Sequence, residues 1–201
     1  MAVQKLDDGR IVCSNASYIH ITPWDSEDGF GASPVTYDIV NIVGDSLAFT
    51  PDDNTINSKE SEFKDDPLFE NVTLGKYQMA GTCIDFQNDV MKAIHGWEVD
   101  SDGNAYAPNG YKDRYATIEI GFRNEDIILV APKVKLNTKA NFSNFKTGTA
   151  EGALAGTAYS EVVKEGKAAC PLARLKSTSG TPATYSVKGK NFKACDGVQA
   201  S

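Results

Sequence analysis

Histidine is scarce in this sequence, and the short motifs that carry most enzymatic chemistry are missing from it. The 201 residues include two histidines, His20 and His95, and no pair of His or Cys residues stands at the short spacing typical of a zinc site. The chain has no Gly-x-Ser-x-Gly, no Gly-x-x-x-x-Gly-Lys-Ser/Thr and no His-Glu-x-x-His. We therefore predict no catalytic residue, no metal and no cofactor, and an enzyme is the least supported class.

Long apolar runs are missing as well. No window approaches the ~18 apolar residues of a membrane span. The first ten residues contain two Asp and no apolar stretch, unlike a secretory signal. We expect a soluble protein made in the cytoplasm, with no membrane partner. In that compartment the four widely spaced cysteines are expected to be free thiols: Cys13, Cys83, Cys170 and Cys195.

Charge is present in quantity, and it is divided by position. Residues 1–110 carry 6 Lys+Arg against 19 Asp+Glu, a net of −13, whereas residues 111–201 carry 14 against 8, a net of +6. Halves of opposite sign can present complementary faces to copies of the same chain, so self-assembly is the first hypothesis. The sequence pI of about 4.9 argues against tight binding of DNA or RNA.

Strand patterns dominate the chain. Residues 17–22 alternate, residues 35–43 are rich in β-branched and aromatic types, and residues 47–50 continue the pattern. Residues 115–122 read as a half-buried strand, with Glu119 on the polar face, and residues 126–136 read as its return strand, with Pro132 marking a bend, bulge or edge. The predicted class is mainly β, a β-sandwich or barrel-like fold with a long β-hairpin.

One short helix is expected beside this sheet. Asn88 is the candidate N-cap, and Gly96 can take the left-handed conformation that ends the helix. His95 lies in the last turn, where a protonated imidazole would favour the negative end of the helix dipole. A second short helix is considered over residues 161–169, although Gly166 interrupts it. The whole chain, residues 1–201, is predicted to be one domain.

Two segments read as long loops. Residues 51–70 carry seven acidic and two basic side chains, a net of −5, with few large apolar groups. Residues 177–201 are basic and loop-rich, and residues 177–190 are expected to form either a hairpin or an extended tail. Asp100, Asp102 and Asn104 mimic the start of a calcium loop, but the pattern fails further on, and a hairpin turn explains it better.

Glycines recur every four residues at 148, 152 and 156. We interpret them as part of a strand or tight loop where another backbone approaches closely, either in a subunit contact or at an internal bend. Lysines and phenylalanines interleave in the basic half and could stack on nucleic acid, although Phe is more often in a core.

The order of these elements resembles the tail tube proteins of long-tailed bacteriophages and related tube-forming injection machines. The residues that carry the resemblance are LGKYQMAGTCIDF at 74–86, NDVMKAIHG at 88–96, and the hairpin 117–136 leading into GALAGTAY at 152–159. The likeness covers residues 72–160 and is one of pattern and order.

This resemblance implies a β-sandwich with a flanking helix, whose copies join sheets into a hexameric ring. Rings would stack into a hollow tube with an acidic lumen that passes phage DNA, located in the virion tail and assembled in the host cytoplasm. The partners are further copies, other tail proteins and, transiently, DNA. It also implies long loops that bridge subunits, for which residues 51–70 are the candidate. The candidate interface residues are Asp52, Asp53, Glu60, Glu62, Asp65, Asp66, Lys133, Lys135, Lys139, Gly152 and Gly156.

Two alternatives stay open. One is another virion component, such as a tail terminator, a sheath-type protein or a capsid-decorating protein. The other is a β-sandwich module that binds carbohydrate or a cell surface through exposed aromatic rings, for which the candidates are Trp24, Trp97, Tyr106 and Tyr111. The role of the basic C-terminal segment is left open.

Overall fold

The fold is mainly β, as the sequence predicts, with 54% of residues in strands. It was obtained as a computed structural model, which describes residues 16–39, 42, 46–61, 64–73, 75–84, 87–110, 112–122, 127–141, 151–177 and 181–194. Side chains are not described for the strand residues 57–61, 64–72, 139–141 and 151. All statements below concern the described residues.

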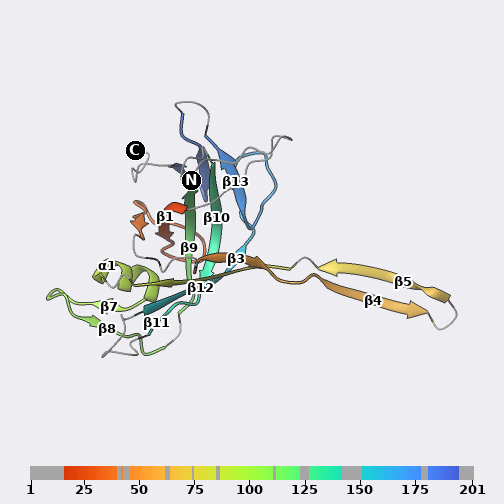
Figure 1. The fold of residues 1–201 in the computed structure, drawn as a ribbon, viewed down its shortest axis with the longest axis horizontal. Coiled ribbons are helices and arrows are strands. Elements are labelled where there is room, and N and C mark those ends of the chain that lie inside the picture. The colour runs from red at the N-terminus through yellow and green to blue at the C-terminus, as the bar shows by residue number, and fades with distance from the viewer. Residues whose placement is uncertain are drawn as a thin grey trace.

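One large antiparallel sheet forms the body (Figure 1). In spatial order its strands are β2 (Tyr37–Asp38), β1 (Ala16–Pro23), β9 (Arg114–Phe122), β10 (Ile127–Leu136), β12 (Glu151–Tyr159), β6 (Tyr77–Cys83) and β3 (Ala48–Pro51). β11 (Lys139–Asn141) pairs with β12, and β13 (Ala173–Lys176) pairs with the first part of β10. Three hairpins lie outside this sheet: β4 (Thr55–Ser61) with β5 (Lys64–Thr73), β7 (Glu98–Val99) with β8 (Ala105–Tyr106), and β14 (Thr184–Val187) with β15 (Lys190–Lys193).

The predicted long hairpin is at the centre of this sheet. β9 and β10 pair antiparallel, and their register shifts between Ala131 and Val134. This shift flanks Pro132, which lacks the backbone N–H that a regular ladder needs. The interruption of the hairpin that was predicted at Pro132 is therefore confirmed, as a shift of register inside the paired strands. It also lets β10 serve two neighbours in turn, because β13 pairs before Ala131 and β12 pairs from Lys133 onward.

β9 is buried on both faces, which corrects the prediction of a half-buried strand. Ala116, Ile118 and Ile120 pack in a first cluster with β1, β6 and the helical segment. Tyr115 packs on the opposite face in a second cluster, to which the β14–β15 hairpin contributes Tyr185 and Val187. That hairpin covers the face that the alternation pattern assigned to solvent. The β14–β15 hairpin is thus a layer of the body. It spans residues 184–193 and overlaps residues 177–190, for which a hairpin was one of the two expectations.

The short helix is present and consists of α1 (Asn88–Val90) followed by the π-helical turn η1 (Met91–His95). Gly96 ends it with φ 71°, as predicted. Asn88 is not the N-cap, because Gln87 occupies that position without a side-chain cap and the Asn88 amide instead donates to the Gly103 carbonyl. That bond ties the helix start to the β7–β8 hairpin, whose turn spans the predicted residues 101–104.

No second helix forms over residues 161–169, so that prediction is wrong. Glu161 and Cys170 instead make a two-residue bridge with backbone bonds of 3.2 and 3.0 Å. Gly166, with φ 74°, lies in the turn between them. A glycine in this conformation ends helical backbone, which is why the apolar pattern is overridden.

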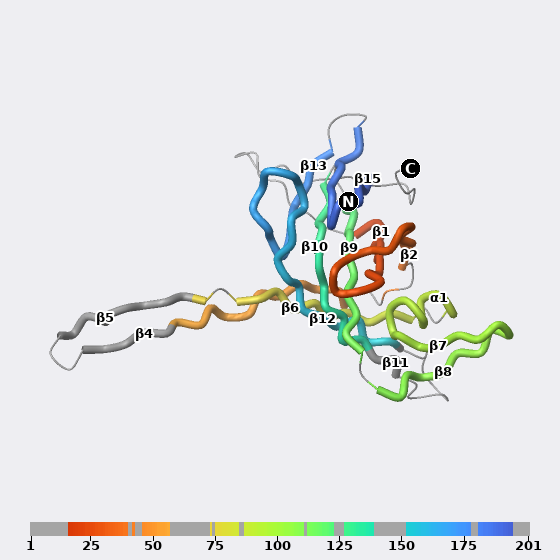
Figure 2. Tube along the Cα trace, turned by 180° about the vertical axis from the view of Figure 1, so that it is seen from behind, coloured from red at the N-terminus to blue at the C-terminus, as the bar shows by residue number. Residues whose placement is uncertain are grey.

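Residues 51–70 are not a loop, which corrects a further prediction. β3 is followed by β4, and β5 leads back into β6, so a two-stranded ribbon leaves the sheet and extends away from the body (Figure 1). We call β4 and β5 the arm. Figure 2 shows that β1 and β2 lie beside β9, at the opposite end of the sheet from the strands that lead into the arm.

Candidate assembly surfaces

The arm is fixed to the body at a defined junction. The Asp52 backbone N–H donates to the Lys76 carbonyl at 2.7 Å, and the Gly75 N–H donates to the Asn54 side chain at 3.0 Å. A Cβ at Gly75 would stand 1.9 Å from the Asp52 carbonyl oxygen, so only glycine lets these two segments of the backbone pass so close to each other. Gln78 donates to the Asp52 carboxylate at 2.7 Å. The direction in which the arm leaves the sheet is therefore set by close backbone contacts.

Beyond this junction the arm has little support from its own chain. β4 and β5 form a separate two-stranded sheet, with Ile56 opposite Val72 and Asn57 opposite Asn71. Ile56 is 61% exposed. The ten residues of β5 correspond to a length of about 30 Å at the usual rise per residue. An isolated two-stranded hairpin is marginally stable at best in water, so we expect a ribbon of two strands to need a covering surface.

The acidic candidates divide between the junction and the arm. Asp52 and Asp53 are exposed, although Asp52 is engaged by Gln78. Glu60, Asp65 and Asp66 lie in β4 and β5, where the backbone is described and the side chains are not. Glu62 lies outside the described residues. Three of the acidic candidates, Glu60, Asp65 and Asp66, therefore lie on the projecting arm, and Asp52 and Asp53 lie at its base.

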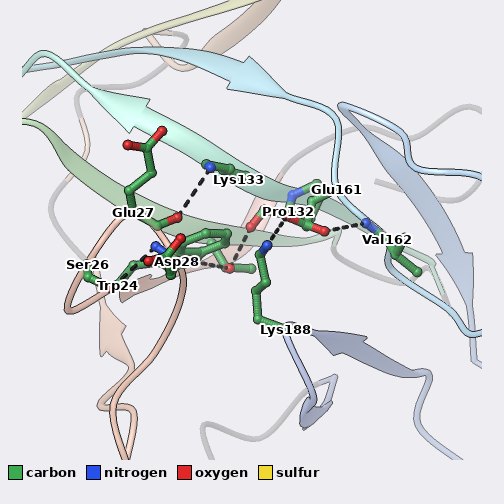
Figure 3. Close-up of polar contacts among 10 residues, drawn as sticks. Trp24, Ser26, Glu27, Asp28, Pro132, Lys133, Glu161, Val162 and Lys188 are labelled. Carbon is green, nitrogen blue, oxygen red and sulfur yellow. Dashed lines mark hydrogen bonds and ion pairs between the residues drawn. The ribbon is translucent and has the colours of Figure 1, made fainter.

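The basic candidates Lys133 and Lys135 are both engaged within the chain. The Lys133 ammonium lies 5.2 Å from the Trp24 ring centre and 4.7 Å from that of Tyr115, and it donates to the Glu27 carbonyl (Figure 3). The Lys135 ammonium pairs with the Asp113 carboxylate at 2.8 Å. Both lysines are part-exposed on β10, so a neighbour would have to compete with these contacts.

Lys139 lies in β11, and its side chain is not described. Only its place in the sheet is defined, opposite Ala153 on β12.

Gly152 and Gly156 are buried inside the chain, and the close approach expected of them is internal. A Cβ at Gly156 would stand 2.7 Å from the Lys135 carbonyl oxygen on β10. A Cβ at Gly152 would stand 2.7 Å from the His95 imidazole. These glycines let β12 pack against β10 and the end of the helix, and in this conformation neither offers surface to a neighbour.

Trp24 is held in the second cluster and is 7% exposed. Its indole N–H donates to the Thr117 hydroxyl at 3.0 Å, and the Lys188 ammonium, paired with Glu161 at 3.1 Å, lies over its ring (Figure 3). A ring enclosed in this way cannot stack on a sugar, so Trp24 is removed from the aromatic candidates. Trp97 is half-buried, Tyr106 is 55% exposed, and Tyr111 lies outside the described residues.

His95 does not supply the positive charge that would favour the negative end of the helix dipole. Burial, aided by the nearby Arg114 guanidinium, lowers the pKa of His95 from its usual 6.5 to about 4. Arg114 supplies the positive charge instead, because its guanidinium donates to the Ile94 carbonyl at 2.7 Å, at the C-terminal end of η1.

Sequence reasoning missed a buried polar cluster around Glu119. Its carboxylate is 4% exposed and accepts a hydrogen bond from the Tyr18 hydroxyl at 2.8 Å. Burial, together with the nearby Glu119 carboxylate, raises the pKa of Tyr185 well above its usual value. The alternation of residues 17–22 and 115–122 shows which side chains share a face of the sheet. It does not show that the β14–β15 hairpin covers one of these faces.

Among the residues with described side chains, no group of three or more His, Cys, Asp or Glu is placed to hold a metal ion. In the same part of the chain, no helix is sufficiently long and apolar to span a membrane. No protein-family model matches the sequence. A search of curated proteins likewise finds no match.

Proposed function

We propose that this chain is a non-enzymatic structural subunit that assembles into stacked rings, in the manner of a phage tail tube that passes DNA. The observation that carries the proposal is the arm, a two-stranded ribbon about 30 Å long that pairs with no other strand in the described part of the chain. A hairpin of this kind gains stability when a second surface covers it. Another copy of the chain is the partner that the resemblance favours.

Charge supports contact between copies. The segment 51–70 carries a net of −5, whereas residues 111–201 carry a net of +6. An acidic arm reaching a basic region of a neighbour would gain attraction on approach, and this attraction would be strongest at low ionic strength. Lys133 and Lys135 have partners in their own chain. To bind the arm of a neighbouring copy, each lysine would have to give up its internal contact for one with the arm.

The short strand at one end of the sheet also supports assembly. β2 has two residues, so among the described residues it pairs with only part of the eight-residue strand β1. Uncovered strand edges pair readily with another chain, and a closed ring removes them. Residues along β1 would therefore lie at a joint between neighbours in a ring.

Sedimentation velocity over a concentration series, followed by negative-stain electron microscopy, tests the proposal. We expect association that grows with concentration and hollow tubes of indefinite length in the images. Closed rings that do not stack would favour a tail terminator instead. Protein that stays monomeric at every concentration and ionic strength would contradict self-assembly.

A further inference from the structure

Three ionisable side chains form a row across the end of the main sheet. His20 on β1 stands directly opposite Asp38 on β2 and directly opposite Glu119 on β9. Residues directly opposite each other in antiparallel strands place their side chains on the same face. The His20 Nε2 atom lies 3.8 Å from the Asp38 carboxylate, and its Nδ1 atom lies 3.9 Å from the Glu119 carboxylate. The row therefore crosses three adjacent strands, with the imidazole on the middle strand and one carboxylate on each of its neighbours.

The row runs from the interior to the surface. The side chains of Glu119, His20 and Asp38 are 5%, 11% and 55% exposed. The inner end is fixed, because the Tyr18 hydroxyl on β1 donates a hydrogen bond to the Glu119 carboxylate. The Tyr18 ring also lies 4.4 Å from the His20 ring, which limits how the imidazole can turn.

Among the kinds of side chain in this row, only an imidazole ordinarily changes its charge between pH 5 and 8. A neutral ring offers neither carboxylate a charge partner. A protonated ring pairs with both at once, and one of the two belongs to the edge strand β2. We infer that His20 acts as a proton-operated clasp, which holds β2 on the sheet in mild acid and loosens it above neutral pH.

The other attachments of β2 do not titrate in this range. The Ile39 backbone N–H donates to the Ile19 carbonyl at 2.8 Å, the hydroxyls of Thr22 and Thr36 lie 2.8 Å apart, and the Ile39 side chain is buried. Protonation of His20 would therefore strengthen the attachment of a strand that these other contacts already hold on the sheet. When β2 detaches, the edge of β1 is uncovered, and an uncovered edge can accept a strand from another chain.

Amide hydrogen exchange of Ile39, measured by NMR on dilute monomer, tests the clasp. Its N–H is bonded to Ile19, so exchange reports detachment of β2. After correction for the intrinsic pH dependence of exchange, we expect protection about two- to fivefold greater near pH 5.5 than near pH 8, as for an exposed ion pair. In Asp38→Asn the ratio should fall to about one, because the charge partner on β2 is gone.

Thr36→Val is the matched control. It removes an uncharged attachment of the same strand, so protection of Ile39 should fall at both pH values while the ratio stays as in the parent chain. Equal protection at the two pH values in the parent, or an unchanged ratio in Asp38→Asn, would overturn the inference. Because the experiment uses monomer, its result is independent of whether the chain assembles.

Discussion

The body and the arm are built from the same kind of antiparallel pair, yet only the body supplies its own core. In the body, β9 and β10 pair with each other and are packed between two apolar clusters. In the arm, β4 and β5 pair with each other and belong to no larger sheet. Hydrogen bonds alone do not stabilise a two-stranded ribbon in water, whereas apolar burial does. We therefore expect the body to fold as a monomer and the arm to gain its order from a partner.

Removing the arm should have the largest effect on assembly. Deletion of residues 55–74 leaves Asp53-Asn54-Gly75 as a three-residue loop between Asp52 and Lys76, with glycine at the position that favours left-handed backbone. We expect tubes to be lost and the melting temperature of the monomer to change little. Electron microscopy and circular dichroism measure the two effects. Tubes of normal length from the deleted chain would remove the arm from the mechanism.

Gly156→Ala tests the internal packing of the body. The added Cβ would stand 2.7 Å from a backbone oxygen of β10, which cannot move without disturbing the sheet. We expect the free energy of unfolding to fall by about 1–3 kcal/mol, measured by chemical denaturation. Gly110→Ala is the control, because nothing lies within 4 Å of a Cβ at that position. Equal stability of the two variants would contradict the close approach of β12 to β10.

His95 should make the body less stable in acid. Its pKa is about 4 in the folded chain and about 6.5 when unfolded, so the unfolded state binds the proton more readily. The contribution is complete above about pH 6.5 and is lost as the pH falls toward 4, by about 1–2 kcal/mol after allowance for solvent screening. Chemical denaturation at several pH values should show a smaller loss in His95→Gln. An equal loss in both chains would contradict a neutral, buried His95.

Reversing charge on the arm should have the smallest effect, one that depends on salt. Asp65→Lys with Asp66→Lys should raise the concentration needed for assembly about two- to tenfold at low ionic strength, and the difference should shrink at high salt. Glu98→Lys with Asp102→Lys changes the net charge equally on the exposed β7–β8 hairpin. If both double variants raised the assembly concentration equally, the effect would come from net charge and not from the location of the charges on the arm.

Local signals in the sequence predicted the features that depend on local chemistry. Pro132 marks a bulge because it has no N–H, and Gly96 ends the helix because it tolerates positive φ. The arm was missed because the few apolar residues of its strands, which include Leu68 and Phe69 side by side in sequence, do not alternate regularly with polar ones. Glu119 was assigned to solvent because the hairpin that covers it comes about sixty residues later, and no local pattern reports that contact.

The candidate site was predicted in part. The sequence identified residues 51–70 as an acidic segment, and a bridging role came only from the resemblance; neither predicted a ribbon fixed at Asp52 and Gly75. It also could not show that Lys133 and Lys135 have partners in their own chain, because those partners lie on separate segments of the fold.

Amide hydrogen exchange of the arm, compared between dilute monomer and concentrated protein, tests the central claim most directly. We predict rapid exchange of the β4 and β5 amides in the monomer and protection on the order of a hundredfold or more once copies associate, while β9 and β10 stay protected in both states. Arm amides that exchange equally fast at every concentration, or that are already fully protected in the monomer, would contradict the account.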